Sequence, residues 1–295
     1  MQKAIQNIKP DASDFKSVAR ALTLVENDLA GADELLKSLV FNKDVPIVGI
    51  TGPPGAGKST LVSSMIGQLL KKDVKIAVLA VDPTSPFNFG SLLGDRIRMN
   101  SHFNHQRVFI RSLATRGSLG GLSAKTIEMT DVLRAAGFDY ILIETVGVGQ
   151  SEVEIAALAD ITLLVLVPES GDEIQNIKSG LMEIADAFIV NKADRAGADL
   201  FVNNLKKVIG QKNGKPLPVF ATVATTDQGV TEVVDYILSS PNLNNNRKEL
   251  LLAEKAYQLI RQKRMADVDK KALRQTISAA MCKPGFNFYS FVAEF

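Results

Sequence analysis

The chain has 295 residues, of which 46% are hydrophobic, and its 34 basic and 32 acidic side chains leave a formal net charge of +2. This balance argues against nucleic acid as the main partner, and the longest apolar run, "ITLLVLV", is too short to cross a membrane. The single cysteine, Cys282, excludes an intramolecular disulfide and suits a reducing compartment, so we expect a cytoplasmic protein.

The N-terminal part of the chain has the apolar spacing of a helix. Apolar residues recur at three- and four-residue steps through residues 14–41, and the pattern starts again after Gly31. We therefore expect a helical segment within residues 1–43.

From Val45 onward, short apolar runs alternate with helical stretches. The runs are apolar throughout rather than at every second position, which is typical of strands that are covered on both faces. Residues 44–240 are therefore predicted to form a doubly wound α/β domain with a mostly parallel sheet. The runs are "PIVGI", "KIAVLAV", "RVFIRS", "YILIE", "TLLVLV", "AFIVN" and "LPVFATV".

The polar, turn-rich stretch "SSPNLNNN" (239–246) is predicted to be a linker. Two helices are expected after it, and the first of them carries an apolar stripe that includes Leu252 and Leu259. The aromatic tail "FNFYSFVAEF" shows no obvious periodicity. Residues 241–295 are thus expected to be a C-terminal helical extension and a candidate for dimerisation.

The stretch "GPPGAGKS" matches the phosphate-binding pattern G-x-x-x-x-G-K-[ST], with a predicted strand before it and a predicted helix after it. Glycines let backbone N–H groups surround the phosphates, Lys58 supplies charge at the β and γ oxygens, and the Ser59 hydroxyl is suited to ligate Mg²⁺. We expect a nucleoside triphosphate to bind here. The residues assigned to the loop are Gly55, Ala56, Gly57, Lys58, Ser59 and Thr60.

The strand "FIVNKAD" ends in the N-K-x-D pattern of guanine-binding proteins, formed by Asn191, Lys192 and Asp194. Asp194 can accept hydrogen bonds from guanine N1–H and the 2-amino group, whereas adenine would leave the carboxylate unpaired. The stem of Lys192 can lie along the base. In "ATVATTDQG", a backbone N–H of Val223 or Ala224 is a weaker candidate for contact with guanine O6. The predicted ligand is therefore GTP or GDP.

Three carboxylates are candidates for the metal and hydrolysis site. Glu144 ends the strand "DYILIE" and is expected to position Mg²⁺ through a water, while Gly147 would donate its N–H to the γ-phosphate. Asp82 ends the next strand after the phosphate loop, and Asp95 lies in the loop that follows. These two acids either complete the metal site or orient the attacking water, and Asp95 has the simpler alternative of capping a turn. With Lys58, the three acids are the candidate catalytic residues.

No arginine can be assigned to the transition state from the sequence, although four arginines are close by in the chain: Arg96, Arg98, Arg111 and Arg116. His102 and His105 are too few to form a metal cluster with the one cysteine, so we expect them to have structural roles.

Taken together, several blocks resemble the methylmalonyl-CoA mutase-associated G-proteins of the MeaB/ArgK type, in order from residues 19–26 to about residue 240. The blocks are "TGPPGAGKSTL", "VDPTSPFNFGSLLGDRIRM", "FIRSLATRGSLGGLS", "ETVGVGQSE", "VPESGDEIQNIKSG" and "VNKAD".

The resemblance implies a GTPase that hydrolyses GTP to GDP and phosphate and chaperones an adenosylcobalamin-dependent acyl-CoA mutase, through cofactor loading and protection. It implies that residues 169–180 form a switch, with Gln175 and Lys178 as candidate reporters. It also implies a homodimer, although the tail of this chain departs from the family's usual ending. The Mg²⁺ ligands that it implies are Ser59, Asp82, Asp95 and Glu144.

Two other functions fit the sequence less well. A kinase linked to amino-acid transport would need an acceptor pocket, which no residue constellation suggests, and would usually prefer ATP. A nickel metallochaperone GTPase would need tracts rich in histidine or cysteine, and this chain has two histidines and one cysteine.

Overall fold

The computed structural model divides the chain into two compact units, Met1–Leu251 and Leu252–Phe295. It describes residues 8–82, 99–114, 124–145, 155–156, 158–170, 184–209, 211–212, 215–240, 253, 256–257, 259–261 and 263–295. Within these residues, no helix combines the length and the apolar character needed to cross a membrane.

The first unit is built on a seven-stranded sheet with the order β3-β2-β4-β1-β5-β6-β9, in which every neighbouring pair is parallel. Each strand coincides with one of the seven predicted apolar runs, so the predicted fold class is confirmed. The strands are β1 (Ile47–Thr51), β2 (Ile76–Asp82), β3 (Val108–Ala114), β4 (Tyr140–Thr145), β5 (Ile161–Leu166), β6 (Ala187–Asn191) and β9 (Val219–Thr222). A short antiparallel hairpin, β7 (Gln211–Lys212) and β8 (Lys215–Pro216), stands apart from this sheet.

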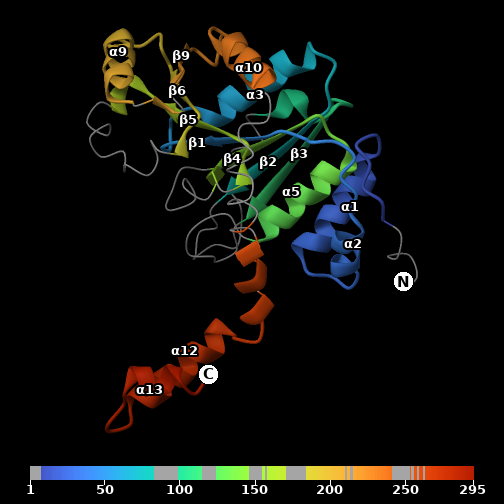
Figure 1. Cartoon of the computed structure of the whole chain (residues 1–295), viewed down its shortest axis with the longest axis vertical. Helices are drawn as coiled ribbons and strands as arrows, with labels where there is room; N and C mark the ends of the chain where they lie inside the picture. Colours follow the sequence, from blue (N-terminus) through green and yellow to red (C-terminus); the bar gives the residue numbers. More distant parts are fainter. Residues whose placement is uncertain are drawn as a thin grey trace. The chain divides into compact units, whose positions relative to one another are not determined.

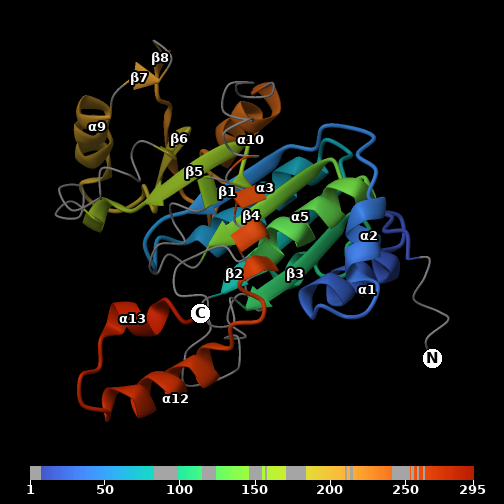
Figure 2. The same ribbon diagram turned by 60° about the horizontal axis from the view of Figure 1, so that its bottom comes forward.

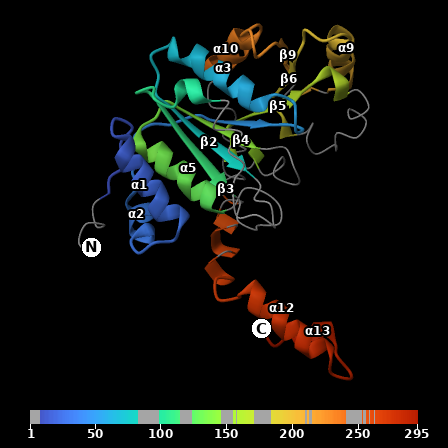
Figure 3. The same ribbon diagram turned by 180° about the vertical axis from the view of Figure 1, so that it is seen from behind.

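Helices cover both faces of the sheet, as the uninterrupted apolar strands predict (Figure 1). One face packs on α3 (Lys58–Leu70) and α10 (Val230–Ser239), which lie side by side (Figure 3). The opposite face packs on α5 (Ala124–Ala136) and on the N-terminal helices (Figure 2). On that same face, alternate residues of β5 and β6 pack on α9 (Ala198–Val208). The sheet thus lies between two helical layers.

The N-terminal segment forms two helices, α1 (Phe15–Glu26) and α2 (Ala32–Ser38), where one helical stretch over residues 14–41 was predicted. The chain turns between them because Asp28 and Gly31 have positive φ angles of 48° and 96°. The segment docks on α5 and β3. Arg111 on β3 pairs with Glu26 at 2.5 Å, and Lys125 on α5 pairs with Asp28.

Aspartates fasten the amino ends of the strands. Three aspartates each precede a strand directly and accept a hydrogen bond from a backbone N–H at 2.7–2.8 Å. The bonds run from Lys75 to Asp139, from Ile47 to Asp160 and from Thr162 to Asp186. Each N–H belongs to a residue at or near the start of the neighbouring strand. The aspartate side chain therefore provides an acceptor for an N–H group that the strand pairing does not satisfy. The amino edge is thereby closed by structural bonds, and the candidate site residues lie at the carboxyl edge.

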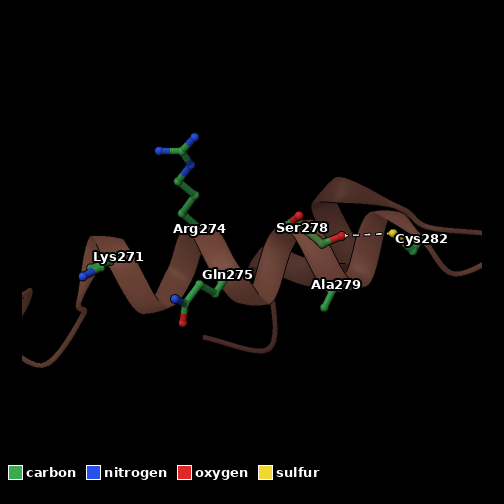
Figure 4. A pocket seen from close by; sticks show the side chains of 6 residues that line it. All are labelled: Lys271, Arg274, Gln275, Ser278, Ala279 and Cys282. Carbon is green, nitrogen blue, oxygen red and sulfur yellow. Dashed lines mark hydrogen bonds between the residues drawn. The ribbon is translucent and has the colours of Figure 1, made fainter.

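The second unit contains α12 (Lys270–Met281) and α13 (Phe288–Val292). Asp269 and Asn287 cap them by accepting hydrogen bonds from backbone N–H groups of the first turn. The helix α13 lies inside the aromatic tail, where no periodicity was visible, and Phe291 is its one buried side chain. Along one side of α12 lies a hollow of about 570 Å³ (Figure 4), which contains none of the predicted site residues. Its lining residues are Lys271, Arg274, Gln275, Ser278, Ala279 and Cys282.

Two glycines offer a matched test of packing against β1. A Cβ on Gly49 would stand 2.7 Å from Ile155 Cγ1 and 2.9 Å from Ala159 Cβ, whereas a Cβ on Gly67 in α3 would meet nothing within 4 Å. We expect Gly49→Ala to lower the free energy of unfolding by about 1–3 kcal/mol through overpacking. Gly67→Ala should raise it by about 0.5–1 kcal/mol, since alanine is the better helix former. Urea unfolding followed by circular dichroism measures both, and an unchanged midpoint for Gly49→Ala would contradict this packing.

Candidate nucleotide-binding site

The phosphate loop connects the carboxyl end of β1 to the start of α3, in the middle of the sheet. Gly52 has a φ of 140°, and a Cβ there would lie 2.1 Å from the carbonyl oxygen of Val165 on the adjacent strand β5. Gly55 and Gly57 have φ values of 79° and 83°, which other residues adopt reluctantly. The glycines of the motif thus allow a loop conformation that side chains would prevent.

Lys58 begins α3 and is 6% exposed. Its Nζ donates hydrogen bonds to the carbonyl oxygens of Gly52 at 2.8 Å and Pro53 at 2.9 Å. The ammonium group is therefore held by the backbone of the loop itself. A phosphate oxygen placed in the loop would meet a charge that is already positioned there.

Ser59 and Glu144 come together although they are far apart in the sequence. Ser59 Oγ lies 2.6 Å from Glu144 Oε1, and both side chains are buried. Ser59 is in the first turn of α3 and Glu144 is near the end of β4, next to β1. The structure thus joins two of the four residues that the sequence proposes for Mg²⁺.

Asp82 is the last residue of β2, which pairs with β4, so its backbone lies at the same edge of the sheet as Glu144. Asp95 and Gly147 lie outside the described residues, as do Gln175 and Lys178 of the predicted switch. Their predicted roles therefore remain predictions.

The donor set fits Mg²⁺. A serine hydroxyl and a carboxylate offer hard oxygen atoms, and Mg²⁺ in nucleotide sites takes one or two protein ligands together with waters and phosphates. In the part of the chain that the structure describes, no three His, Cys, Asp or Glu residues gather as a metal cluster.

Asn191 joins the phosphate loop to the residues that follow β9. Its amide Nδ2 donates to the carbonyl of Ala56 at 2.9 Å. Its Oδ1 accepts from Thr222 Oγ1 and from the Ala224 N–H, each at 3.2 Å. The side chain is 2% exposed, so both ends of the amide act in a dry environment. In this structure, therefore, Asn191 connects the phosphate loop to the segment around the end of β9.

Lys192 also contacts the phosphate loop, because its Nζ donates to the carbonyl of Gly55 at 2.8 Å. Its φ of 57° places the backbone in the left-handed region, and the next residue, Ala193, donates its N–H to Thr222 O at 3.0 Å. Asp194 is exposed at the carboxyl edge of the sheet. The carboxylate that is predicted to identify guanine is accessible to a ligand.

The backbone N–H groups proposed for guanine O6 already have acceptors within the protein. Val223 N–H donates to Gln228 O at 3.0 Å, and Ala224 N–H donates to Asn191 Oδ1 at 3.2 Å. Contact with a base would require one of these N–H groups to be shared between two acceptors. The longer bond, at Ala224, is the easier one to share.

Two further side-chain pairs at this edge were missed by sequence reasoning. Thr145 Oγ1 lies 3.0 Å from Thr51 Oγ1, which ties the ends of β4 and β1 together in the buried interior. The hydroxyl of Ser64 on α3 donates to the Asp227 carboxylate in the loop after β9. Neither pair belongs to a motif, so only the three-dimensional arrangement reveals them.

One of the nearby arginines has a structural role here. Arg111 pairs with Glu26, and the other three arginines lie outside the described residues. The two histidines also make structural bonds. His102 Nε2 lies 3.0 Å from Ser63 O, and His105 Nδ1 accepts from the Arg107 N–H.

Replacing Asn191 tests whether its amide holds the two loops together. Asn191→Ala should lower the free energy of unfolding by about 2–3 kcal/mol, because it leaves buried groups on both loops without partners. At pH 7, Asn191→Asp should cost at least as much despite its equal size, because a carboxylate oxygen would face the carbonyl of Ala56. Urea unfolding measures both.

Asn203→Ala is the matched control, because Asn203 is exposed on α9 and should change stability by less than about 0.5 kcal/mol. An Asn191→Asp protein as stable as wild type would show that the donor end of the amide is not needed.

Comparison with known proteins agrees with the fold described above. The crystal structure of a LAO/AO transport system kinase superimposes with a TM-score of 0.66, covering 95% of this chain and 91% of that chain at 24% sequence identity. At that level of identity, the likeness shows the fold alone.

Sequence relatives are more similar. A protein of Pyrococcus horikoshii that carries the name of a GTPase is 51% identical over 231 residues, which is 76% of this chain and 73% of that protein. The GTPase ArgK of Escherichia coli is 42% identical over 183 residues, which is 60% of this chain and 55% of that protein.

Finally, the family model described as methylmalonyl-CoA mutase-associated GTPase MeaB matches residues 18–281. With a phosphate loop, the N-K-x-D motif and a match over most of its length, the chain belongs to the MeaB family and is a GTPase.

Proposed function

We propose that this GTPase is a nucleotide-dependent chaperone of an adenosylcobalamin-dependent acyl-CoA mutase, acting in cofactor loading and protection. The observation that carries the proposal is a relative from Geobacillus kaustophilus named fused isobutyryl-CoA mutase, which is 37% identical over 233 residues. The match covers 72% of this chain but only 21% of that protein. The family description also names a mutase.

The described residues support the nucleotide chemistry of the proposal. Lys58 is held where it would neutralise charge on the β- and γ-phosphates, and Glu144 holds the Ser59 hydroxyl at the entrance of α3. When bound, Mg²⁺ would offset the charge that develops during phosphoryl transfer. Ser59 and Glu144 would hold it, and we propose that Asp82 and Asp95 complete the set. Gly147 is proposed to contact the γ-phosphate.

A route from the base motif toward the proposed switch begins at Arg195, directly after Asp194. The Arg195 guanidinium pairs with Glu169 in η3 (Pro168–Ser170), and the hydrogen bond from Arg195 lowers the pKa of the Glu169 carboxyl. Glu169 is the first residue of the segment 169–180 that we propose as the switch, with Gln175 and Lys178 as reporters to the mutase. Such an exposed pair contributes little to the stability of the fold.

We further propose that the protein acts in the cytoplasm as a homodimer. Exposed apolar side chains of the second unit are the candidates that we propose for the contact between two copies. They include Tyr257, Ile260, Met265, Met281, Tyr289 and Phe295.

Exchanging Asp194 for asparagine tests the choice of base. Asp194→Asn should weaken GTP binding by about a hundredfold, because one carboxylate oxygen becomes an amide N–H group that faces a guanine donor. Binding of xanthosine triphosphate should strengthen, since its 2-oxo group accepts from the new amide. Calorimetric titration measures both affinities. Asp199→Asn, an exposed change on α9, is the control, and unchanged GTP selectivity of Asp194→Asn would rule out base recognition by this residue.

Adding the partner tests the chaperone role. GTP turnover, measured as phosphate release, should rise at least about tenfold with a methylmalonyl-CoA or isobutyryl-CoA mutase from the same organism, because a partner can supply transition-state charge. Lys178→Ala should lose this acceleration while keeping the basal rate, and Lys206→Ala on α9 should behave as wild type. If no mutase forms a complex or accelerates turnover, the proposal is wrong and a kinase function becomes the better account.

A further inference from the structure

The loop that follows β9, residues 223–229, is here called the base loop. It is held in one conformation by backbone bonds, since Val223 N–H donates to Gln228 O and Thr226 N–H donates to Val223 O, both at 3.0 Å. Gly229 closes it with a φ of 72°, and a Cβ there would stand 2.1 Å from the carbonyl oxygen of Ala221. The base loop therefore packs closely against the end of its own strand.

Within this loop, Asp227 has a φ of 60°, in the left-handed region that residues with a side chain seldom adopt. Its carboxylate accepts a hydrogen bond from the hydroxyl of Ser64, which is 8% exposed on α3. A non-glycine residue persists in this conformation only where its surroundings hold it there. The bond from Ser64 is a contact of that kind, and it joins residues 163 positions apart.

This bond links the two halves of the site. The helix α3 carries Lys58 and Ser59 in its first turn, and Ser64 follows on the same rigid element. The base loop carries Ala224, whose N–H donates to Asn191 Oδ1 in a long bond of 3.2 Å. Tying Asp227 to α3 therefore sets the distance between the phosphate-binding turn and the N–H groups that would face a purine.

We infer that Asp227, anchored by Ser64, is a positioning residue for base selectivity. It touches no nucleotide, but it holds the base loop where a backbone N–H meets the oxygen at position 6 of the purine. The inference rests on the proposed guanine recognition. It assigns the two edges of the base to different residues, position 6 to the base loop and the 2-amino group to Asp194.

Because the base loop and Asp194 contact different edges of the base in this proposal, the bond between Ser64 and Asp227 should affect selectivity at position 6 only. ATP carries an amino donor at position 6, so it would face an N–H donor of a correctly placed base loop. Inosine triphosphate keeps the oxygen at position 6 and lacks only the 2-amino group. A loosened base loop should therefore reduce the preference for GTP over ATP and leave the preference for GTP over inosine triphosphate unchanged.

The test compares the affinities of GTP, ATP and inosine triphosphate by calorimetry with Mg²⁺ in the full-length protein and its variants. Ser64→Ala and Asp227→Ala should each lower the GTP-to-ATP affinity ratio by about tenfold, the effect of losing one hydrogen bond to a charged group. Asp227→Asn keeps an acceptor for the Ser64 hydroxyl and should stay within about threefold of wild type.

Asp227→Gly separates positioning from folding. Glycine adopts the left-handed conformation without strain, and this gain offsets part of the stability lost with the Ser64 bond, so the melting temperature should stay above that of Asp227→Ala. The GTP-to-ATP ratio should nevertheless fall as it does in Asp227→Ala, because the anchor is gone. A purely structural role would instead change the melting temperature without changing the ratio.

Two results would overturn the inference in distinguishable ways. If wild type prefers GTP over ATP and folded Ser64→Ala and Asp227→Gly keep the wild-type ratio, the anchor has no part in selectivity and the proposed guanine recognition stands. If wild type itself shows no preference for GTP, the proposed base recognition and this inference fail together.

Discussion

The site depends on a single buried amide. Asn191 donates to the carbonyl of Ala56 in the phosphate loop and accepts from Thr222 at the end of β9 and from Ala224 in the base loop. Because the side chain is almost completely buried, each bond is made away from competing water and each unmade bond would be costly. The elements that would bind the phosphates and the elements that would bind the base are thus parts of one hydrogen-bonded unit before any ligand arrives.

The sheet explains why these groups can meet. All seven strands run parallel, so their carboxyl ends share one edge, and the chain crosses from one side of β1 to the other between β4 and β5. In open α/β sheets, ligands bind outside the carboxyl ends at such a switch point. The phosphate loop follows β1, Glu144 lies near the end of β4 and Asn191 ends β6. The opposite edge is closed by the aspartates that precede β4, β5 and β6.

Sequence reasoning succeeded where one local signal determines the outcome. Uninterrupted apolar runs predicted every strand of the sheet, and "GPPGAGKS" placed the loop between β1 and α3. It failed where the outcome depends on partners that are distant in the chain or on unusual backbone angles. The turn at Asp28, with φ of 48°, divides a continuous helical pattern, and the bond between Ser64 and Asp227 spans 163 residues. Motif analysis also did not reveal that Asn191 and Lys192 donate hydrogen bonds to the phosphate loop.

The central claim is that the phosphate loop and the base loop are assembled as one unit through Asn191, and a ligand without a base tests it most directly. Inorganic triphosphate with Mg²⁺ can contact only the phosphate end of the site. Calorimetric titration into wild type and Asn191→Ala should show that the substitution weakens triphosphate binding by about tenfold, because the loop loses its support from Asn191. Equal triphosphate affinity in the two proteins, alongside weakened GTP binding, would show that Asn191 acts only at the base and would contradict the account.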